Sequence, residues 1–176
     1  MFKNLNFIFN SKVFNYQDSK IVRLPRNVVY NTIADVPNYH RFLPWCKESE
    51  WVSDVHSIND SKKKIARNAI LTVHFALIRE SYVSKVILEP EKAVQAIAAD
   101  SILFERLDTN WEMTCKEDVT LINFSICYKF NNPFYQHLST SFNSIIANTM
   151  LRHFIEECHS RHKLLSTYPF MMNMEM

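Results

Sequence analysis

The sequence predicts a single α+β domain: a curved antiparallel sheet with two short helices and one long C-terminal helix across its concave face. Apolar residues recur at every second position through much of the segment from Cys46 to Phe130, which is the period of a half-buried strand. Before and after this segment they recur three or four residues apart, which is the period of a helix. Strands segregated from helices in this way are typical of α+β folds, in which helices cover one face of the sheet.

The N-terminal part predicts one strand followed by two short helices. Residues Lys12 to Leu24 form the strand candidate, and Arg26 to Asp35 carries apolar residues at helical spacing. Pro37 should end that helix and begin a second short one toward Phe42, because proline fits the first helical position and not the interior.

Consecutive strands follow, and the last is the clearest. Apolar and polar residues alternate from Ile122 to Phe130, as in an antiparallel strand with one face in the core. Turns are expected at Asn59-Asp60-Ser61 and at Pro90-Glu91. Because the chain has no glycine, we expect every turn to be made by Asn, Asp, Ser or Pro.

The remainder predicts one long helix. Asn132 is the expected N-cap and Pro133 the expected first helical residue. From Phe134 to Phe154 an apolar stripe recurs at helical spacing, and the helix should run to about Leu164. At 1.5 Å per residue its length would be ~45 Å.

Composition excludes several classes of function. A chain of 176 residues, 47% hydrophobic and 22% charged, suits one folded domain, and its 13% aromatic content could line a cavity as well as fill a core. The net charge of +2 is too small to indicate a nucleic-acid partner. The absence of glycine excludes Gly-rich phosphate loops and dinucleotide fingerprints. No segment approaches the ~20 apolar residues needed to span a bilayer.

We expect the folded domain to occupy residues 15–165. Residues 1–14 form an N-terminal extension that is hydrophobic, basic and free of acids, so it is either the remnant of a mitochondrial targeting segment or a frayed terminus. Residues 166–176 form a C-terminal tail. The cysteines are far apart and form no Cys-X-X-Cys pair, which favours reduced thiols.

No cluster of residues in the sequence requires catalysis or a metal. Cys158, His159 and His162 lie close together on the long helix, but further ligands are missing, so we interpret them as a solvated helix end. The adjacent acids at Glu117-Asp118 and Glu156-Glu157 cannot converge on one point. We therefore predict no catalytic residue, no metal, no cofactor and no enzymatic activity.

One segment carries a specific family resemblance. From Asp35 to Cys46 the chain reads Asp-Val-Pro-Asn-Tyr-His-Arg-Phe-Leu-Pro-Trp-Cys. With the preceding helix, it closely resembles the opening of the coenzyme Q-binding START-domain proteins, which belong to the polyketide-cyclase-like, helix-grip superfamily. Weaker matches follow along the strands: Leu71 to Phe75, Glu80 to Val86, Leu103-Phe104, Trp111, Phe124 to Ile126 and Tyr128 to Phe130.

The resemblance implies a carrier or chaperone that binds coenzyme Q (ubiquinone) as its ligand. It implies peripheral contact with the matrix side of the mitochondrial inner membrane and support for respiration and quinone biosynthesis, with complexes of those pathways as partners. The ligand should occupy an apolar cavity beneath the long helix. The predicted lining residues are Phe42, Leu43, Pro44, Trp45, Leu71, Val73, Phe75, Tyr82, Trp111, Phe124, Ile126, Tyr128, Phe142, Ile146 and Met150.

Three alternatives remain open on the sequence. The cavity could carry another lipid, such as a sterol or phospholipid, or it could host cyclase-like chemistry guided by His74 or Tyr82. The third alternative is a ribosome-associated interaction protein, which would need a basic patch that the small net charge does not provide. His74 stands where relatives often have glycine, and we expect it to narrow the cavity or to add a polar group there.

Overall fold

The computed structural model of the chain describes residues 12–52, 55–59, 63–75, 78–132 and 136–167. The predicted order of elements is confirmed within these ranges. Strand β1 (Phe14–Val22) is followed by helix α1 (Arg26–Ala34), the single turn η1 (Val36–Asn38) and the short helix α2 (Tyr39–Phe42). Seven further strands precede the long helix α3 (Gln136–Thr167): β2 (Cys46–Trp51), β3 (His56–Asn59), β4 (Lys64–Phe75), β5 (Ile78–Glu89), β6 (Ala93–Asp100), β7 (Phe104–Lys116) and β8 (Val119–Phe130).

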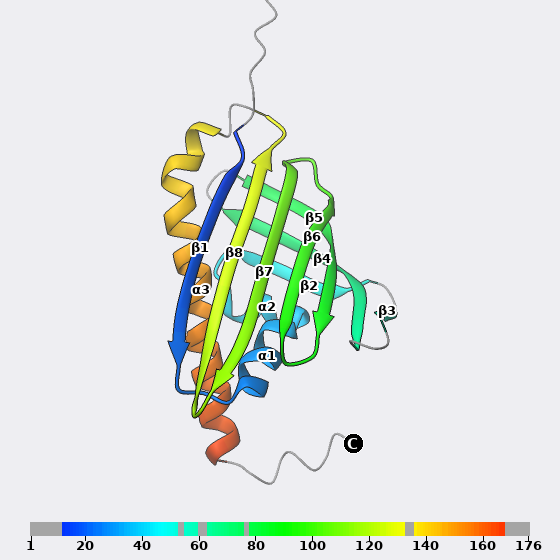
Figure 1. The fold of residues 1–176 in the computed structure, drawn as a ribbon. Coiled ribbons are helices and arrows are strands. Elements are labelled where there is room, and N and C mark those ends of the chain that lie inside the picture. The colour runs from blue at the N-terminus through cyan, green and yellow to red at the C-terminus, as the bar shows by residue number, and fades with distance from the viewer. Residues whose placement is uncertain (1–11, 53–54, 60–62, 76–77, 133–135, 168–176) are drawn as a thin grey trace, which may run out of the picture.

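All the strands join one antiparallel sheet. Its order is β1-β8-β7-β6-β5-β4-β2, and β3 pairs with β4 beside β2. β1 closes one edge by pairing with β8, with Phe14 opposite Tyr128. In Figure 1, α3 runs behind β1 and β8, and α1 and α2 lie on the same side of the sheet. This is the predicted helix-grip arrangement, in which the sheet curves around one long helix.

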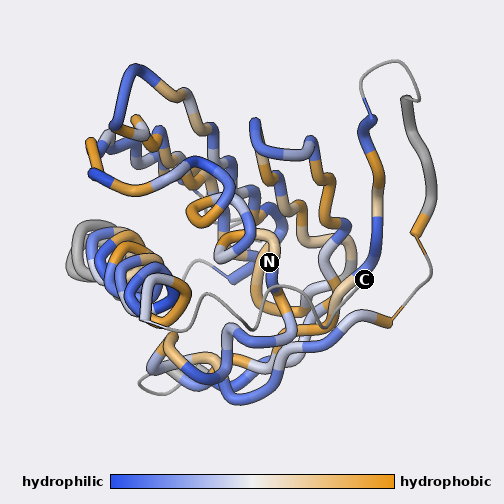
Figure 2. The backbone as a smooth tube through the Cα atoms, turned by 90° about the horizontal axis from the view of Figure 1, so that it is seen from below, coloured by the Kyte–Doolittle hydropathy of each residue, from blue (hydrophilic) through white to orange (hydrophobic). Residues whose placement is uncertain are grey.

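The alternation that predicts β8 corresponds to an alternation of buried and partly buried side chains. Every second residue of β8 from Thr120 to Phe130 is buried, and the residues between them are only partly buried. Figure 2, which looks nearly along α3, shows hydrophobic and hydrophilic residues alternating along the strands. The buried set contributes to one core that also contains Phe154 of α3 and Ile33 of α1.

The limits of the long helix differ slightly from the prediction. The helix is described from Gln136 to Thr167, three residues beyond Leu164. The expected first helical residue, Pro133, falls within residues 133–135, and the expected turn at Asn59-Asp60-Ser61 reaches residues 60–62; both ranges lie outside the described residues.

The turn expected at Pro90-Glu91 is confirmed, but the left-handed positions of the turns are taken by residues that the expectation did not include. Among the described residues, Lys63, Glu91 and Glu117 adopt the left-handed backbone conformation, with φ of 52°, 57° and 54°. This conformation costs a residue with a Cβ atom more than it costs glycine. A chain without glycine must place other residues there, and at these positions they are Lys and Glu instead of Asn or Asp.

Candidate ligand-binding cavity

An apolar cavity, here called the hollow, lies between the concave face of the sheet and α3. Its volume is about 140 Å³. Strands β4 to β8 contribute most of its wall, and residues of the η1–β2 segment and of α3 complete it. A cavity of roughly 150 Å³ with apolar walls can hold a benzene molecule. The hollow therefore has room for one six-membered ring.

Small side chains at the centre of the sheet leave this space open. Ala96 of β6 lines the hollow and pairs with Thr109 of β7. Ser84 of β5 also lines it and is flanked by Ala69 and Ala98 on the neighbouring strands. Protein interiors are otherwise densely packed, so leucine-sized side chains at these positions would fill the space.

An aromatic cluster lies beneath the C-terminal half of α3 and adjoins the hollow. The ring centroid of Trp111 is 4.2 Å from that of Phe124 and 4.8 Å from that of Phe154. Phe154 also packs edge-on against Tyr39 and Phe42, each with a centroid distance of 5.0 Å. Edge-to-face contacts of this kind add to the energy of area burial. The cluster thus holds α2 and α3 together over the sheet.

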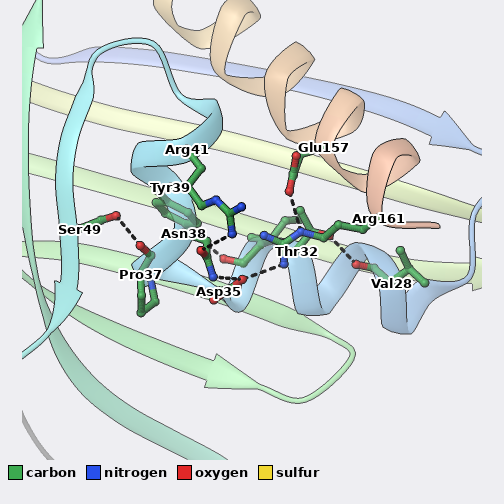
Figure 3. A network of polar contacts seen from close by, with 11 residues as sticks. Val28, Thr32, Asp35, Pro37, Asn38, Tyr39, Arg41, Ser49, Glu157 and Arg161 are labelled. Carbon is green, nitrogen blue, oxygen red and sulfur yellow. Dashed lines mark hydrogen bonds and ion pairs between the residues drawn. The ribbon is translucent and has the colours of Figure 1, made fainter. Parts of the chain in front are cut away.

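A polar network fixes the same part of α3 to the helical pair (Figure 3). Arg161 of α3 donates to Asp35, at the junction of α1 and η1, and to Glu157 on its own helix, both at 2.8 Å. Asp35 also accepts a hydrogen bond of 2.8 Å from the side-chain amide of Asn38. The carboxylate of Asp35 therefore joins the start of the family-like segment to α3.

Most of the predicted lining residues do border the hollow. Those on the strands are Leu71, Val73, Tyr82, Trp111, Ile126 and Tyr128. Those outside the sheet are Leu43, Trp45 and Met150. The structure places these residues in the wall of the hollow, and their contact with a ligand stays a prediction.

The other predicted residues lie elsewhere. Phe42 and Phe124 belong to the aromatic cluster and do not line the hollow, and Pro44 is exposed outside it. The side chains of Phe75, Phe142 and Ile146 lie outside the described part of the structure.

The expectation for His74 is wrong. Its side chain is exposed, because the residues of β4 that face the hollow are Leu71 and Val73, and His74 has the opposite parity. Only its backbone N–H contributes nearby, through a hydrogen bond of 2.8 Å to the carbonyl of Trp45.

Sequence reasoning missed several lining residues on the strands. Ser84 and Val86 follow Tyr82 at two-residue steps, and Thr109 and Leu107 precede Trp111 at the same spacing. Because alternate residues of a strand share a face, extending the parity of the predicted residues would have found all four. Val36 and Tyr39, which come from the helical segment, carry no such signal.

The ionisable groups of the wall stay neutral. Burial raises the pKa of Tyr82 above its ordinary value, and the neighbouring Cys46 and Glu80 add to this effect. Burial also raises the pKa of Tyr128 to about 12 and raises the pKa of the Cys46 thiol. The hollow therefore offers hydroxyl groups within an apolar wall and no charged group.

Within the described ranges, no group of three or more His, Cys, Asp or Glu side chains is placed to hold a metal ion. Among the helices that the structure describes, none is long and apolar enough to cross a membrane.

The fold and the hollow define a helix-grip protein, and the sequence identifies the family to which the chain belongs. The profile of the family described as "Polyketide cyclase / dehydrase and lipid transport" matches residues 22–155, and the chain belongs to this family. The resemblance noted in the segment from Asp35 to Cys46 is thereby supported over most of the domain.

Its curated relatives carry a common name. The chain is 30% identical over 148 residues to the mitochondrial coenzyme Q-binding protein COQ10 homolog B of Xenopus laevis, covering 82% of this chain and 57% of the relative. It is also 30% identical over 150 residues to the mitochondrial coenzyme Q-binding protein COQ10 of Dictyostelium discoideum, covering 84% of this chain and 70% of the relative. The chain thus spans little more than half the length of the Xenopus protein.

Solved structures confirm the fold. The Zhui aromatase/cyclase from Streptomyces sp. R1128 superposes with a TM-score of 0.72 at 13% identity, covering 85% of this chain and 96% of that one. A START superfamily protein from Mycobacterium smegmatis superposes with a TM-score of 0.65 at 12% identity, covering 86% and 98%. At such low identities the likeness concerns the fold alone.

Proposed function

We propose that this protein is a carrier that binds coenzyme Q, or a closely related polyprenyl quinone, in the hollow beneath α3. The observation that carries the proposal is an apolar cavity, sized for one ring, in a chain whose relatives are named coenzyme Q-binding proteins. Coenzyme Q would be the bound ligand, and this function requires no further cofactor. The predicted residues that line the hollow are the proposed contacts.

The physical chemistry of the ligand supports a carrier. Each five-carbon isoprene unit costs roughly 3–4 kcal/mol to expose to water, at ~0.8 kcal/mol per CH₂ group. A few units exceed the free energy of a nanomolar complex, about 12 kcal/mol. A protein that presents such a lipid must replace part of its membrane environment. The wall of the hollow provides an apolar surface for that purpose.

We further propose that the protein is not an enzyme, although its fold is shared with cyclases. A general acid or base works best with a pKa near the operating pH. Burial moves the pKa of Tyr82 away from that range, and His74, the other candidate, is exposed outside the hollow. Both observations favour binding over proton transfer.

The proposed location is the matrix side of the mitochondrial inner membrane, since the relatives above are named mitochondrial. The membrane contact would be the loop between β6 and β7, where Ile102 is 91% exposed. Phe104, two positions after Ile102 and the first residue of β7, lines the hollow, so this loop lies at the edge of the hollow. Complexes of quinone biosynthesis or respiration would be the partners that receive the lipid.

The backbone of this loop is suited to an apolar environment. Glu80 accepts hydrogen bonds from the Ser101 hydroxyl (2.8 Å) and from the Leu103 N–H (2.9 Å). The side-chain amide of Asn131 donates to the Ile102 carbonyl at 2.8 Å. Backbone groups that enter lipid must be satisfied within the protein. These bonds leave fewer polar groups of the loop to be dehydrated when Ile102 meets a bilayer.

The decisive experiment is mass spectrometry of lipids that co-purify with the protein from its native host, followed by rebinding of the delipidated protein. We expect coenzyme Q among the lipids, and saturable quenching of tryptophan fluorescence by decylubiquinone. A sterol or phospholipid in place of quinone would assign the hollow to another lipid. Failure of delipidated protein to bind any quinone analogue would refute the proposal.

A further inference from the structure

Three hydroxyl groups in the wall of the hollow have no hydrogen-bond partner among the described residues. They belong to Tyr82 and Ser84 of β5 and to Thr109 of β7. Each is the only polar group of its side chain. Their surroundings are otherwise apolar, since most of the wall consists of aliphatic and aromatic side chains.

The other buried serine and threonine hydroxyls in the described fold are satisfied. Four serine or threonine residues of the described chain are buried, and three of them donate to backbone carbonyls. Thr32 donates to Val28 at 2.8 Å, Thr120 donates to Leu24 at 2.8 Å, and the Ser49 hydroxyl donates to Pro37 at 3.1 Å. The fourth is Ser84, which is 4% exposed and faces the hollow. Its hydroxyl opens onto the hollow, so a molecule in the hollow can supply the bond that the protein does not.

The register of the sheet places the hydroxyls on two sides of a gap. β6 lies between β5 and β7, and its Ala96 pairs with Thr109. Tyr82 and Ser84 are two residues apart on β5, so they share a face. Strands lie ~4.8 Å apart, which separates β5 from β7 by roughly 10 Å. A six-membered ring lying over Ala96 would have one edge toward β5 and the opposite edge toward β7.

We propose that the hollow holds the oxygen-bearing ring of the ligand, with Tyr82 and Ser84 bonded to oxygen at one edge and Thr109 to oxygen at the other. This inference rests on the proposed function and specifies which end of the lipid enters. A prenyl tail in the hollow would leave all three hydroxyls without partners, whereas the two carbonyl oxygens of a para-quinone accept from both sides. The hollow has the volume of a single ring, so the tail lies outside it.

The ionisation of Tyr82 is consistent with this role. Burial raises the pKa of its hydroxyl, which therefore keeps its proton and can donate at physiological pH. Serine and threonine hydroxyls also accept, so the same three groups could bond to the hydroxyls of a quinol.

The test compares two probes of equal tail length, decylubiquinone and decylbenzene, in titrations of the delipidated full chain. We expect the quinone to bind about tenfold more tightly than the hydrocarbon. The variants Ser84→Ala, Thr109→Val and Tyr82→Phe should each weaken quinone binding about fivefold, the effect of one lost hydrogen bond. Binding of decylbenzene should stay the same or strengthen.

Two matched controls separate this role from a structural one. Thr72→Val removes a hydroxyl on the other face of β4, where it bonds to Ser81 and Glu48, and should change neither affinity. Thr120→Val removes a buried hydroxyl bonded to the Leu24 carbonyl and should lower the midpoint of thermal unfolding. Ser84→Ala should leave that midpoint unchanged or raise it, because it removes a hydroxyl that has no partner in the protein.

The outcomes distinguish the two proposals. If the unaltered protein binds decylubiquinone and the three variants bind it equally well, the ring is not held by these hydroxyls, although the carrier function stands. Equal affinity of the unaltered protein for the two probes would overturn the inference in the same way. If the unaltered protein binds neither quinone nor quinol, the proposed function itself is wrong.

Discussion

Arg161, near the end of α3, donates a hydrogen bond of 2.8 Å to Asp35, which lies 126 positions earlier in the chain. Both side chains are about three-quarters buried, with 26% and 29% of their surfaces exposed. Asp35 stands at the start of the segment that resembles the coenzyme Q-binding proteins. The pair therefore connects the helix that covers the hollow to the loop that leads into its wall.

We predict that Asp35→Asn lowers the free energy of unfolding by about 1–2 kcal/mol, the cost of a lost charge-assisted hydrogen bond. A double-mutant cycle with Arg161→Gln, measured by urea unfolding, should give a coupling energy of about 1 kcal/mol. The matched control is Arg152→Gln, because Arg152 and Glu156 form an exposed pair at 3.9 Å that should contribute almost nothing. Equal losses at Arg152 and Arg161 would contradict a special role for Asp35.

Filling the hollow should block binding without unfolding the protein. Ala96→Leu places three more carbon atoms in a space of about 140 Å³, so thermal stability should be unchanged or higher. Affinity for decylubiquinone should fall by at least about tenfold, since one leucine side chain takes up much of the room for a ring. Ala99→Leu, on the exposed face of the same strand, is the control and should bind normally. Normal binding by Ala96→Leu would place the ligand elsewhere.

The contribution of Ile102 to membrane contact can be tested against a second exposed isoleucine. Ile21 is 70% exposed and pairs with Leu121 near the β7–β8 turn, at the opposite end of the sheet from the β6–β7 loop. Burying an isoleucine in lipid contributes about 2 kcal/mol. Ile102→Asn should therefore weaken co-sedimentation with phosphatidylcholine vesicles by roughly tenfold. Ile21→Asn should have no effect, and a similar loss in both variants would exclude the loop as the specific contact.

Stability should decline in alkaline solution because of Cys158. Burial raises the pKa of its thiol from 9.0 to about 11. A raised folded-state pKa gives a contribution that is complete below pH 9 and is lost as the pH rises toward 11. Urea midpoints measured from pH 8 to pH 11 should fall, and the fall should be smaller in Cys158→Ala.

The exposed Cys115 should react rapidly with thiol reagents at pH 8, whereas Cys158 should react only on unfolding.

The residues with a left-handed backbone conformation lead to a prediction about stability. Glu117 has a φ of 54° in the hairpin between β7 and β8, and glycine adopts this conformation without steric cost. Glu117→Gly should raise the free energy of unfolding by up to about 1 kcal/mol. Asp118→Gly, at the adjacent position, where φ is not positive, should be neutral or destabilising. Stabilisation by both substitutions would point to a cause other than backbone geometry.

The fold could be predicted because each element has a local signal. The alternation from Ile122 to Phe130 predicts the strand β8. The change of period after Asn131 predicts the long helix. The shape of the hollow had no such signal. It depends on Ala96, Ser84 and Ala69 being small at neighbouring places in the sheet, and this proximity follows from strand pairing that periodicity does not specify.

The candidate site was predicted in part for the same reason. Trp111, Tyr128 and Leu71 could be predicted because they are apolar residues on predicted strands, and the parity of those strands places them on the wall. Phe124 shares that parity but packs against the ring of Trp111 instead of lining the hollow, since residues along one strand face different neighbours. Thr109 and Ser84 are polar, so an apolar pattern does not indicate them. Hydrophobicity alone does not find a hydroxyl group that faces an apolar cavity.

The hollow also has a consequence for how the protein should respond to compression. In protein stripped of lipid, about 140 Å³ of internal space disappears when the chain unfolds, so unfolding reduces the volume of the system. High hydrostatic pressure should therefore denature the stripped protein more readily than the loaded one. A carrier of this design would be mechanically softer when delivering its cargo than when holding it.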